Sequence, residues 1–374
     1  MPLLSPSPNE WVSVSARLEA EHLFKVFGRR QNEAVERLRE GATREELRAD
    51  GTTAAVIDVS FTVGPGQIFV VMGLSGSGKS TLLRMLNGLL EPTAGRVLFD
   101  GRDLTALSGR DLREVRARKI SMVFQHFALF PHRSVLDNAA YGLAVQGAPR
   151  AEREERATEA LRLCGLAGWE KSWPDELSGG MQQRVGLARA LATDADLLLM
   201  DESFSALDPL IRRDMQDQLL TLQQTLKKTI VFITHDLNEA MRLGDRIAVM
   251  RDGRIVQTGT AEDILLRPGN DYVASFIQDV DRSRVLTASA VMDPHVRGDE
   301  ADCGCETATP DTPFTTLCAL SARLTHPVAV LDGGRGLVGV VPRRRLVGLL
   351  GDAEGPGTPC DRERNRRKEV TARA

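Results

Sequence analysis

A glycine-rich segment near residue 75 has the residue types and the spacing to bind a chain of phosphates. Residues 73–81 read Gly-Leu-Ser-Gly-Ser-Gly-Lys-Ser-Thr and fit the pattern G-x-x-x-x-G-K-[ST]. Glycines let successive backbone N–H groups curve around phosphate oxygens, and a following helix adds partial positive charge at its N-terminus. Lys79 would reach the β- and γ-phosphates, and the Ser80 hydroxyl would take one place around Mg²⁺. The expected nucleotide-binding residues of this loop are Gly73, Ser75, Gly76, Ser77, Gly78, Lys79, Ser80 and Thr81.

Two carboxylates follow an apolar run further along the chain. Residues 197–200 are all apolar and predict a buried strand, and Asp201 and Glu202 come directly after it. Because α/β sheets place ligands at the carboxyl ends of their strands, both side chains are candidates for chemistry. We expect Asp201 to hold the Mg²⁺ shell through water and Glu202 to polarise the water that attacks the γ-phosphorus of ATP. These two elements alone leave a kinase, a GTPase and a helicase as alternatives.

A serine-glycine-glycine segment between these two elements distinguishes the alternatives. Residues 177–182 read Leu-Ser-Gly-Gly-Met-Gln and open a predicted helix at 182–192. In order and spacing, the phosphate loop, this segment and the acidic strand resemble the Walker A, signature and Walker B motifs of the ABC ATPases. The resemblance implies that ATP is clamped between two copies, with Ser178, Gly179 and Gly180 of one copy facing the γ-phosphate held by the other. A single copy is expected to be nearly inactive.

The same resemblance assigns roles to residues outside these motifs. Gln125 matches the Q-loop, Asp208 the D-loop and His235 the switch histidine, and Phe27 matches the aromatic residue that stacks on adenine, with Phe24 as its rival. The local alternatives are a simple helix cap at residues 178–180 and a structural role for His235. The implied catalytic residues are Glu202, His235, Lys79 and Gln125, and the implied Mg²⁺ ligands are Ser80, Gln125 and Asp201.

The elements that must carry these residues follow an alternating pattern. From Val56 onward, short β-branched runs alternate with helical stretches, which predicts an α/β fold with a parallel sheet and crossover helices. The predicted strands are 21–27, 68–72, 120–124, 197–200, 229–233 and 246–250, and the predicted long helices are 137–166 and 182–192. We expect residues 56–280 to form a P-loop ABC-type ATPase domain with a helical subdomain at about 135–180.

Residues 1–55 are expected to add an N-terminal strand and a helical insertion to the same ATPase unit. In that insertion, Thr43 and Glu46 have the spacing of a capping box and predict a helix start. After about residue 280 the sequence pattern changes. It predicts a strand at 328–331, a turn at 332–336 and a strand at 337–341, followed by a helix near Pro342. Residues 281–352 resemble a degenerate CBS domain, a small α+β regulatory fold, and 353–374 are expected to be a basic disordered tail.

Composition excludes several classes of protein. The 374 residues carry a net charge of −3, which argues against a chain built to coat nucleic acid. No run approaches the roughly 20 apolar residues needed to cross a bilayer, and the N-terminus lacks the basic-then-apolar build of a secretory signal. Five dispersed cysteines argue against a disulfide framework, and Cys303 and Cys305 lack the further ligands of a zinc site. A reducing cytoplasm is the expected environment.

Further similarity narrows the branch of the family. Residues 72–88, 124–131 and 201–210, together with the helical insertion, resemble the glycine betaine/proline uptake ATPases. This implies a transport-coupled ATPase at the cytoplasmic face of the inner membrane, peripheral, whose partners are a second copy, integral-membrane permease subunits and, indirectly, a substrate-binding protein. We expect the permease to dock at residues 125–132, where Phe127, Leu129 and Phe130 are apolar. An ordinary core role for these three side chains is the alternative.

Two other functions compete with this interpretation. The first is the ATPase subunit of another ABC importer, for an amino acid or other small solute. The second is a non-transport ABC ATPase that acts on DNA or ribosomes. DNA-repair forms would insert a long coiled coil between the phosphate loop and the signature, and ribosome-associated forms carry two ATPase units per chain. The interval between Ser80 and Ser178 has no sustained heptads.

Overall fold

A computed structural model describes residues 17–125, 127–278, 280–294, 306–333 and 336–351. The chain divides into two compact units, 1–264 and 265–374, which are described separately. The predicted start of the C-terminal region at 281 therefore falls inside the second unit. Cys303, Cys305 and the predicted tail at 353–374 lie outside the described residues.

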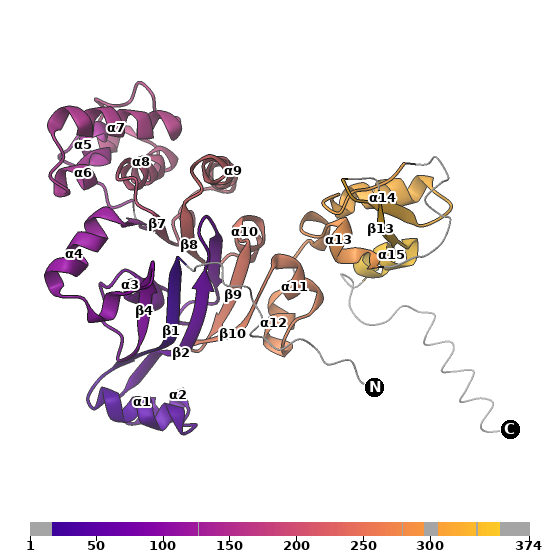
Figure 1. The fold of residues 1–374 in the computed structure, drawn as a ribbon, viewed down its shortest axis with the longest axis horizontal. Helices are drawn as coiled ribbons and strands as arrows, with labels where there is room; N and C mark the ends of the chain where they lie inside the picture. The colour runs from indigo at the N-terminus through magenta and orange to yellow at the C-terminus, as the bar shows by residue number, and fades with distance from the viewer. Residues whose placement is uncertain (1–16, 126, 279, 295–305, 334–335, 352–374) are drawn as a thin grey trace. The chain divides into compact units, whose positions relative to one another are not determined.

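A six-stranded sheet forms the centre of the first unit (Figure 1). Its order is β10-β9-β3-β8-β7-β6, and every neighbouring pair is parallel except β9 and β10. These strands confirm the predicted α/β architecture, and five of them match predicted strands. Their bounds are β3 Ile68–Met72, β6 Ile120–Val123, β7 Leu197–Asp201, β8 Thr229–Thr234, β9 Arg246–Arg251 and β10 Arg254–Gly259.

The central strands are buried because other elements pack on both faces of the sheet. Every residue of β3 and β8 is buried, which explains why both read as continuous apolar runs. Helix α3 (Lys79–Leu86) follows β3 and places Leu82, Leu83 and Leu86 in the core beside Phe69 and Val231. The phosphate loop is therefore fixed at both of its ends.

A second, antiparallel sheet has the order β2-β1-β4-β5 and packs on the first. The rings of Phe61 and Phe69, one from each sheet, stack with their centroids 4.7 Å apart. Only strand 21–27 of this sheet was predicted, and it extends further than expected. The elements are β1 Leu18–Phe27, β2 Thr53–Val63, β4 Ala94–Phe99 and β5 Arg102–Asp103, followed by the 3₁₀ turn η1 Leu104–Ala106 and helix α4 Gly109–Arg118.

The predicted helical insertion joins β1 to β2 as α1 (Gln31–Arg39) and α2 (Arg44–Ala49). Thr43 and Glu46 form the predicted capping box, since each side chain accepts a hydrogen bond from the other residue's backbone N–H. Leu38 and Leu47 are buried in a separate apolar cluster with Phe24 of β1. The insertion is thus a packed part of the unit.

The helical subdomain corrects one prediction. A continuous helix at 137–166 is wrong, because the structure has α5 (Val135–Ala139), α6 (Tyr141–Val145) and α7 (Arg150–Leu163). Gly147 adopts a left-handed φ of 80°, and Pro149 caps α7, so the chain cannot remain helical between α6 and α7. The second predicted helix is confirmed as α8 (Gly179–Ala192), preceded by the 3₁₀ turn η2 (Pro174–Glu176).

The remaining helices of the first unit are α9 (Pro209–Leu226), α10 (Leu237–Leu243) and α11 (Ala261–Leu266), the last of which crosses the division between units. The second unit begins with α12 Asp271–Phe276, η3 Arg282–Arg284 and α13 Ala288–Val291. A three-stranded sheet of order β11-β13-β12 follows, with β11 Asp293–Pro294, β12 Val328–Leu331 and β13 Leu337–Val341. Helices α14 Phe314–Arg323 and α15 Arg343–Gly351 complete it. The predicted strand at 328–331, the strand at 337–341 and the helix after them are confirmed here, while part of the predicted turn, residues 334–335, lies outside the described residues. No helix within the described ranges could span a membrane.

Candidate nucleotide site

The phosphate loop lies between β3 and α3, as predicted, and its glycines are required by geometry. Gly78 has a φ of 104°, and a Cβ there would lie 2.2 Å from the carbonyl oxygen of Ala55. A Cβ at Gly73 would lie equally close to the carbonyl oxygen of Met250. The Ser77 Oγ is buried and has no hydrogen-bond partner among the described residues, so the loop retains capacity for a ligand.

Lys79 is held inside this loop. Its side chain is 4% exposed, and its Nζ donates hydrogen bonds to the carbonyl oxygens of Gly73 at 2.9 Å and Leu74 at 3.1 Å. Burial lowers the pKa of the Lys79 ammonium, while Glu202, whose Oε1 is 3.6 Å away, opposes that shift. A phosphate chain in the loop would replace weak carbonyl partners with charged ones, which are stronger acceptors.

Ser80 and Asp201 meet at the carboxyl ends of β3 and β7. The Ser80 Oγ donates to the Asp201 Oδ1 at 3.0 Å, and burial raises the pKa of the Asp201 carboxyl above its ordinary value. A hydroxyl and a carboxylate that lacks solvation form the oxygen donor set that Mg²⁺ prefers, so these residues fit the ion. No group of three or more His, Cys, Asp or Glu side chains is placed to hold a metal in the described part of the chain. Such an ion would therefore also need oxygens from a bound phosphate.

Glu202 and His235 are brought together from the ends of β7 and β8. The His235 Nδ1 lies 3.0 Å from the Glu202 Oε2, and the Glu202 side chain is 18% exposed. Glu202 adopts a left-handed φ of 44°, and its backbone N–H donates to the Ile233 carbonyl of β8. A non-glycine residue in this conformation is strained, which is typical of positions held for function. The pair can take up a proton next to the phosphate loop.

Gln125 reaches the D-loop and not the Ser80–Asp201 pair. Its Nε2 donates to the Ser205 Oγ at 3.4 Å, and that hydroxyl donates to the Glu202 carbonyl at 2.8 Å. Asp208 caps α9 by accepting from the backbone N–H groups of Leu210 and Ile211 at 3.1 Å. The predicted contact of Gln125 with a metal thus remains a prediction.

Sequence reasoning missed Arg212, which links the D-loop to the segment after His235. Its guanidinium donates to three D-loop carbonyls, those of Phe204, Ser205 and Leu207, and to the Asp236 Oδ2 at 3.1 Å. In the sequence Arg212 stands next to Arg213 in an ordinary charged helix, so only its distance from the Asp208 cap, one helical turn, could have identified it.

The signature and the aromatic candidates lie apart from these residues. Ser178 caps α8 through the Met181 N–H, and residues 178–180 are not among the described residues that line the phosphate-loop cavity. Phe27 is 41% exposed at the end of β1, with the Lys25 Nζ 5.4 Å from its ring centroid. Phe24, its rival, is 3% exposed inside the insertion cluster, so its ring cannot receive a base.

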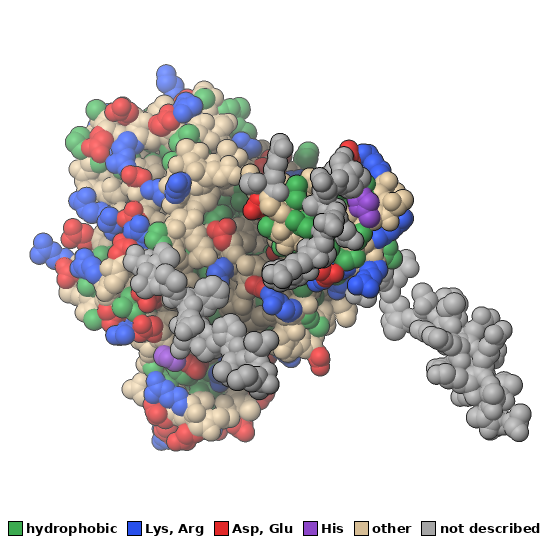
Figure 2. All heavy atoms as spheres, turned by 45° about the vertical axis from the view of Figure 1, so that its right-hand side comes forward, with side chains coloured by type: hydrophobic (Ala, Val, Ile, Leu, Met, Phe, Trp, Pro, Cys, Tyr) green, Lys and Arg blue, Asp and Glu red, His purple; other side chains and the backbone are tan. Residues whose placement is uncertain are grey.

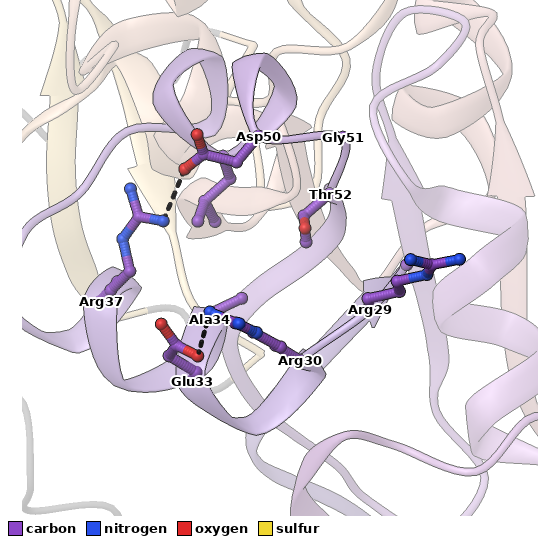
Figure 3. A pocket seen from close by; sticks show the side chains of 10 residues that line it. Arg29, Arg30, Glu33, Ala34, Arg37, Asp50, Gly51 and Thr52 are labelled. Atoms are coloured by element: carbon purple, nitrogen blue, oxygen red, sulfur yellow. Dashed lines mark hydrogen bonds and ion pairs between the residues drawn. The ribbon is translucent and has the colours of Figure 1, made fainter.

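Two cavities lie near the site. The first, of 210 Å³, is formed by the phosphate loop and its surroundings, with Arg44, Ala55, Ser75, Gly76, Gly78, Lys79, Ser80, Thr81 and Glu202 lining it. The second, of 730 Å³, opens between α1, α2 and the turn after β1 (Figure 3). Arg37 is paired there with Asp50 at 2.7 Å and Arg30 with Glu33 at 3.6 Å. The first cavity therefore holds the phosphate chemistry, because Lys79 and Glu202 line it.

Comparison with known proteins agrees with this site. A family model described as "ABC transporter" matches residues 56–205. The chain is 59% identical over 277 residues to the glycine betaine transport ATP-binding protein OpuAA of Bacillus subtilis, which covers 74% of this chain and 66% of that one. It is 52% identical to the glycine betaine/carnitine transport ATP-binding protein GbuA of Listeria monocytogenes, over 87% of this chain and 80% of the relative.

A solved structure is similar as well. The dimeric structure of MJ0796, titled a bacterial ABC transporter cassette, is 31% identical with a TM-score of 0.56, and it covers 65% of this chain and 98% of its own. A second structure of MJ0796, bound to ADP and Pi in a post-hydrolysis state, is 30% identical with a TM-score of 0.55. The similarity therefore extends to a cassette solved with nucleotide products.

Proposed function

Because the chain belongs to the ABC transporter family of ATP-binding proteins, we propose that it binds and hydrolyses ATP to power a membrane importer. The observation that carries this proposal is the meeting of five side chains at one sheet edge: Lys79 lies 3.6 Å from Glu202, Glu202 lies 3.0 Å from His235, and Ser80 is bonded to Asp201 nearby. This set has a cation for the phosphates, a carboxylate for the attacking water and an oxygen pair for Mg²⁺.

Each residue has a separate task in this reaction. The loop N–H groups and Lys79 bind the β- and γ-phosphates, and Ser80 and Asp201 hold Mg²⁺, which supplies charge neutralisation to the phosphates when bound. Glu202 accepts the proton of the attacking water, and His235 keeps its carboxylate oriented through the 3.0 Å contact. Gln125 is linked to Glu202 through the Ser205 hydroxyl of the D-loop, so a change at the reaction site could be transmitted to Gln125.

Two copies of the chain are proposed to act together. Ser178, Gly179 and Gly180 stand at the start of α8, where backbone N–H groups are available to an anion. They are not among the described residues that line the phosphate-loop cavity of their own chain, and the similar MJ0796 cassette was solved as a dimer. We therefore assign these residues, with Asp208, to the ATP bound by the second copy.

The proposed substrates are glycine betaine and related quaternary ammonium solutes, because the similar proteins OpuAA and GbuA are named for glycine betaine transport. A second candidate is trimethylamine N-oxide, because the TmoW protein of Ruegeria pomeroyi, named for that transport, is 49% identical over 75% of this chain. Both solutes would be recognised by other subunits: membrane permeases and, indirectly, a substrate-binding protein. The chain itself would act peripherally at the cytoplasmic face of the membrane.

The permease is proposed to dock at residues 125–132. Phe127, Leu129 and Phe130 are half-buried, and the neighbouring Phe124 is 39% exposed, so this segment offers apolar surface next to the Q-loop. The Phe130 ring lies 4.6 Å from the Tyr141 ring and 5.1 Å from the Arg133 guanidinium, which holds the segment against α6.

The C-terminal unit is proposed to be a degenerate CBS-like regulator.

Glu202→Gln tests the proposed reaction. The amide keeps the size of the side chain but cannot accept the proton, so turnover should fall by at least about 100-fold. ATP affinity should stay within about twofold of wild type, and size-exclusion chromatography with MgATP should show a stable dimer, because binding precedes the lost step. Normal hydrolysis by this variant would remove Glu202 from the mechanism.

The substrate proposal needs the assembled transporter. Vesicles that contain this subunit, its permease and its binding protein should take up labelled glycine betaine only when ATP is supplied on the side of the membrane where this subunit lies. ATP-driven uptake of trimethylamine N-oxide without glycine betaine uptake would instead support the second candidate.

A further inference from the structure

A side chain of the helical insertion reaches the phosphate loop. The Arg44 Nη2 donates to the Gly76 carbonyl oxygen at 3.3 Å, and its Nη1 lies 3.4 Å from the Asp252 Oδ1. Arg44 also lines the 210 Å³ cavity together with Lys79 and Glu202. A residue separated from the loop by a whole strand in sequence therefore forms part of its wall.

The insertion holds this guanidinium in place through several contacts. The Thr43 capping box fixes the first turn of α2, and therefore the position from which Arg44 projects. Leu47, one turn later, is 1% exposed in the apolar cluster. Arg37 of α1 bonds to Asp50 at 2.7 Å just after α2 ends. Such support from caps, packing and ion pairs is what positions a functional group accurately.

The charge around Arg44 leaves it suited to an anion. The side chain is 27% exposed, and its partner Asp252 is 61% exposed and also accepts from the Arg251 Nε at 3.3 Å. Both contacts of Arg44 are at the long end of the hydrogen-bond range, so exchanging one for a phosphate oxygen would cost little. Arginine presents several N–H donors in a rigid fork that matches phosphate geometry.

We propose that Arg44 is a nucleotide-binding residue: a second phosphate-facing cation, besides Lys79, that the helical insertion contributes to the ATP site. The inference rests on the proposed binding of ATP. It gives the insertion a function in the same chain, because α1 and α2 then serve to carry a charge to the phosphate loop. The chemistry recognised is the polyphosphate, with the base left to Phe27.

Three variants of the full-length chain test this, with MgATP binding measured by calorimetry. Arg44→Ala should weaken ATP binding about tenfold, the effect of one hydrogen bond to a charged group. Arg44→Lys should bind ATP with an affinity between those of wild type and Arg44→Ala, because the positive charge remains while the guanidinium fork is lost. Arg48→Ala is the matched control, since Arg48 is an exposed arginine of the same helix α2 and does not line the loop cavity. It should bind ATP as wild type does.

The outcomes separate this inference from its premise. Wild-type affinity in Arg44→Ala, or equal losses in Arg44→Lys and Arg44→Ala, would overturn the proposed phosphate contact. A fall in the nucleotide-free melting temperature of Arg44→Ala that accounts for its lost affinity would also overturn it, because the role would then be structural. If the wild-type chain bound no ATP while folded, the proposed function would fail first.

Discussion

The two helical additions to the central sheets differ in what they complete. The insertion α1–α2 encloses its own apolar cluster, and its Arg44 contacts the phosphate loop of the same chain. The subdomain formed by α5 to α8 instead leaves large apolar side chains exposed: Val145 at 60%, Trp169 at 40% and Trp173 at 46%. Its signature residues are not among the described residues that line the phosphate-loop cavity.

This difference indicates which half of the ATP site a single chain can supply. The side with Lys79, Ser80 and Asp201 is preassembled by contacts inside one chain, and the insertion adds to it. The side with Ser178 and Gly179 is proposed to act on the ATP bound by a second copy. Charged side chains of both signs are interspersed on the face of the molecule that Figure 2 shows, which does not resemble a nucleic-acid-binding surface.

The largest expected effect separates the two halves directly. Gly179 is exposed, and a Cβ there would lie 3.6 Å from the Phe127 ring, an ordinary contact, so the fold should tolerate Gly179→Asp. The new carboxylate would face the γ-phosphate of the second copy and should lower ATPase turnover by at least about 100-fold. ATP binding to the single chain should remain unchanged, as measured by calorimetry.

Mixing two inactive variants provides the control for this result. Lys79→Ala should lose ATP binding but keep an intact signature. A mixed dimer of Lys79→Ala and Gly179→Asp contains one complete site, made from the loop of one chain and the signature of the other. It should therefore regain turnover that neither variant shows alone. Failure of the mixture to hydrolyse ATP would contradict a site shared between chains, provided that both variants fold.

The second prediction concerns the proposed permease contact at residues 125–132. Phe130→Asp should lower transport about tenfold by placing a charge in the proposed permease contact, the size of a moderate interface loss. ATP binding should be unaffected, because Phe130 is remote from the contacts that form the phosphate site. Equal losses of transport and ATP binding would instead assign Phe130 to the core. Val145→Asp, an exposed site in α6 outside residues 125–132, is the control and should have a small effect.

The sequence predicted most of the preassembled half of the site. The phosphate loop was predicted from its glycine pattern, Asp201 and Glu202 from the apolar run before them, and His235 from the resemblance to the ABC ATPases. The carboxyl ends of parallel strands meet at one edge, so order along the chain was enough to place these residues together. The structure removes Phe24 as the rival of Phe27, because the Phe24 ring is buried, and the stacking of Phe27 on a base stays a prediction.

Contacts between distant segments were beyond sequence reasoning. Arg44 and Arg212 each act through a guanidinium that reaches backbone carbonyls of another segment, and nothing in their local sequence marks them. The helix at 137–166 was predicted as continuous because its charged residues suit a helix, while Gly147 and Pro149 interrupt it. The local sequence pattern therefore predicted most helices and strands, whereas only the folded structure shows which charged side chains contact distant segments.

The third prediction tests the energetic cost of the preassembled half. Because burial raises the pKa of Asp201 in the folded chain, the folded state binds a proton there more tightly than the unfolded state does. Stability from this group is therefore lost as pH rises through the raised pKa. Asp201→Asn should stabilise the nucleotide-free protein at neutral pH by about 1 kcal/mol, a typical gain at a strained functional site.

Chemical denaturation across a pH range measures this effect. The stability gained by Asp201→Asn should shrink as pH falls toward the ordinary pKa range of an aspartate, because residue 201 is then neutral in both the wild type and the variant. MgATP should stabilise the wild type but not the variant, because the amide removes a charge that the nucleotide complex needs. A variant that is less stable than wild type at neutral pH would show that the Ser80 contact outweighs the burial of charge.

The smallest effect is expected in the insertion, at the cap of α2. Thr43→Ala removes the side chain that accepts from the Glu46 N–H and should cost about 0.5–1 kcal/mol of unfolding free energy. Since this cap fixes the start of the helix that carries Arg44, ATP affinity should fall less than in Arg44→Ala but in the same direction. Thr43→Ser keeps the hydroxyl and should restore both quantities. If Thr43→Ala lowered stability without changing ATP affinity, the insertion would be a packed addition without a part in the nucleotide site.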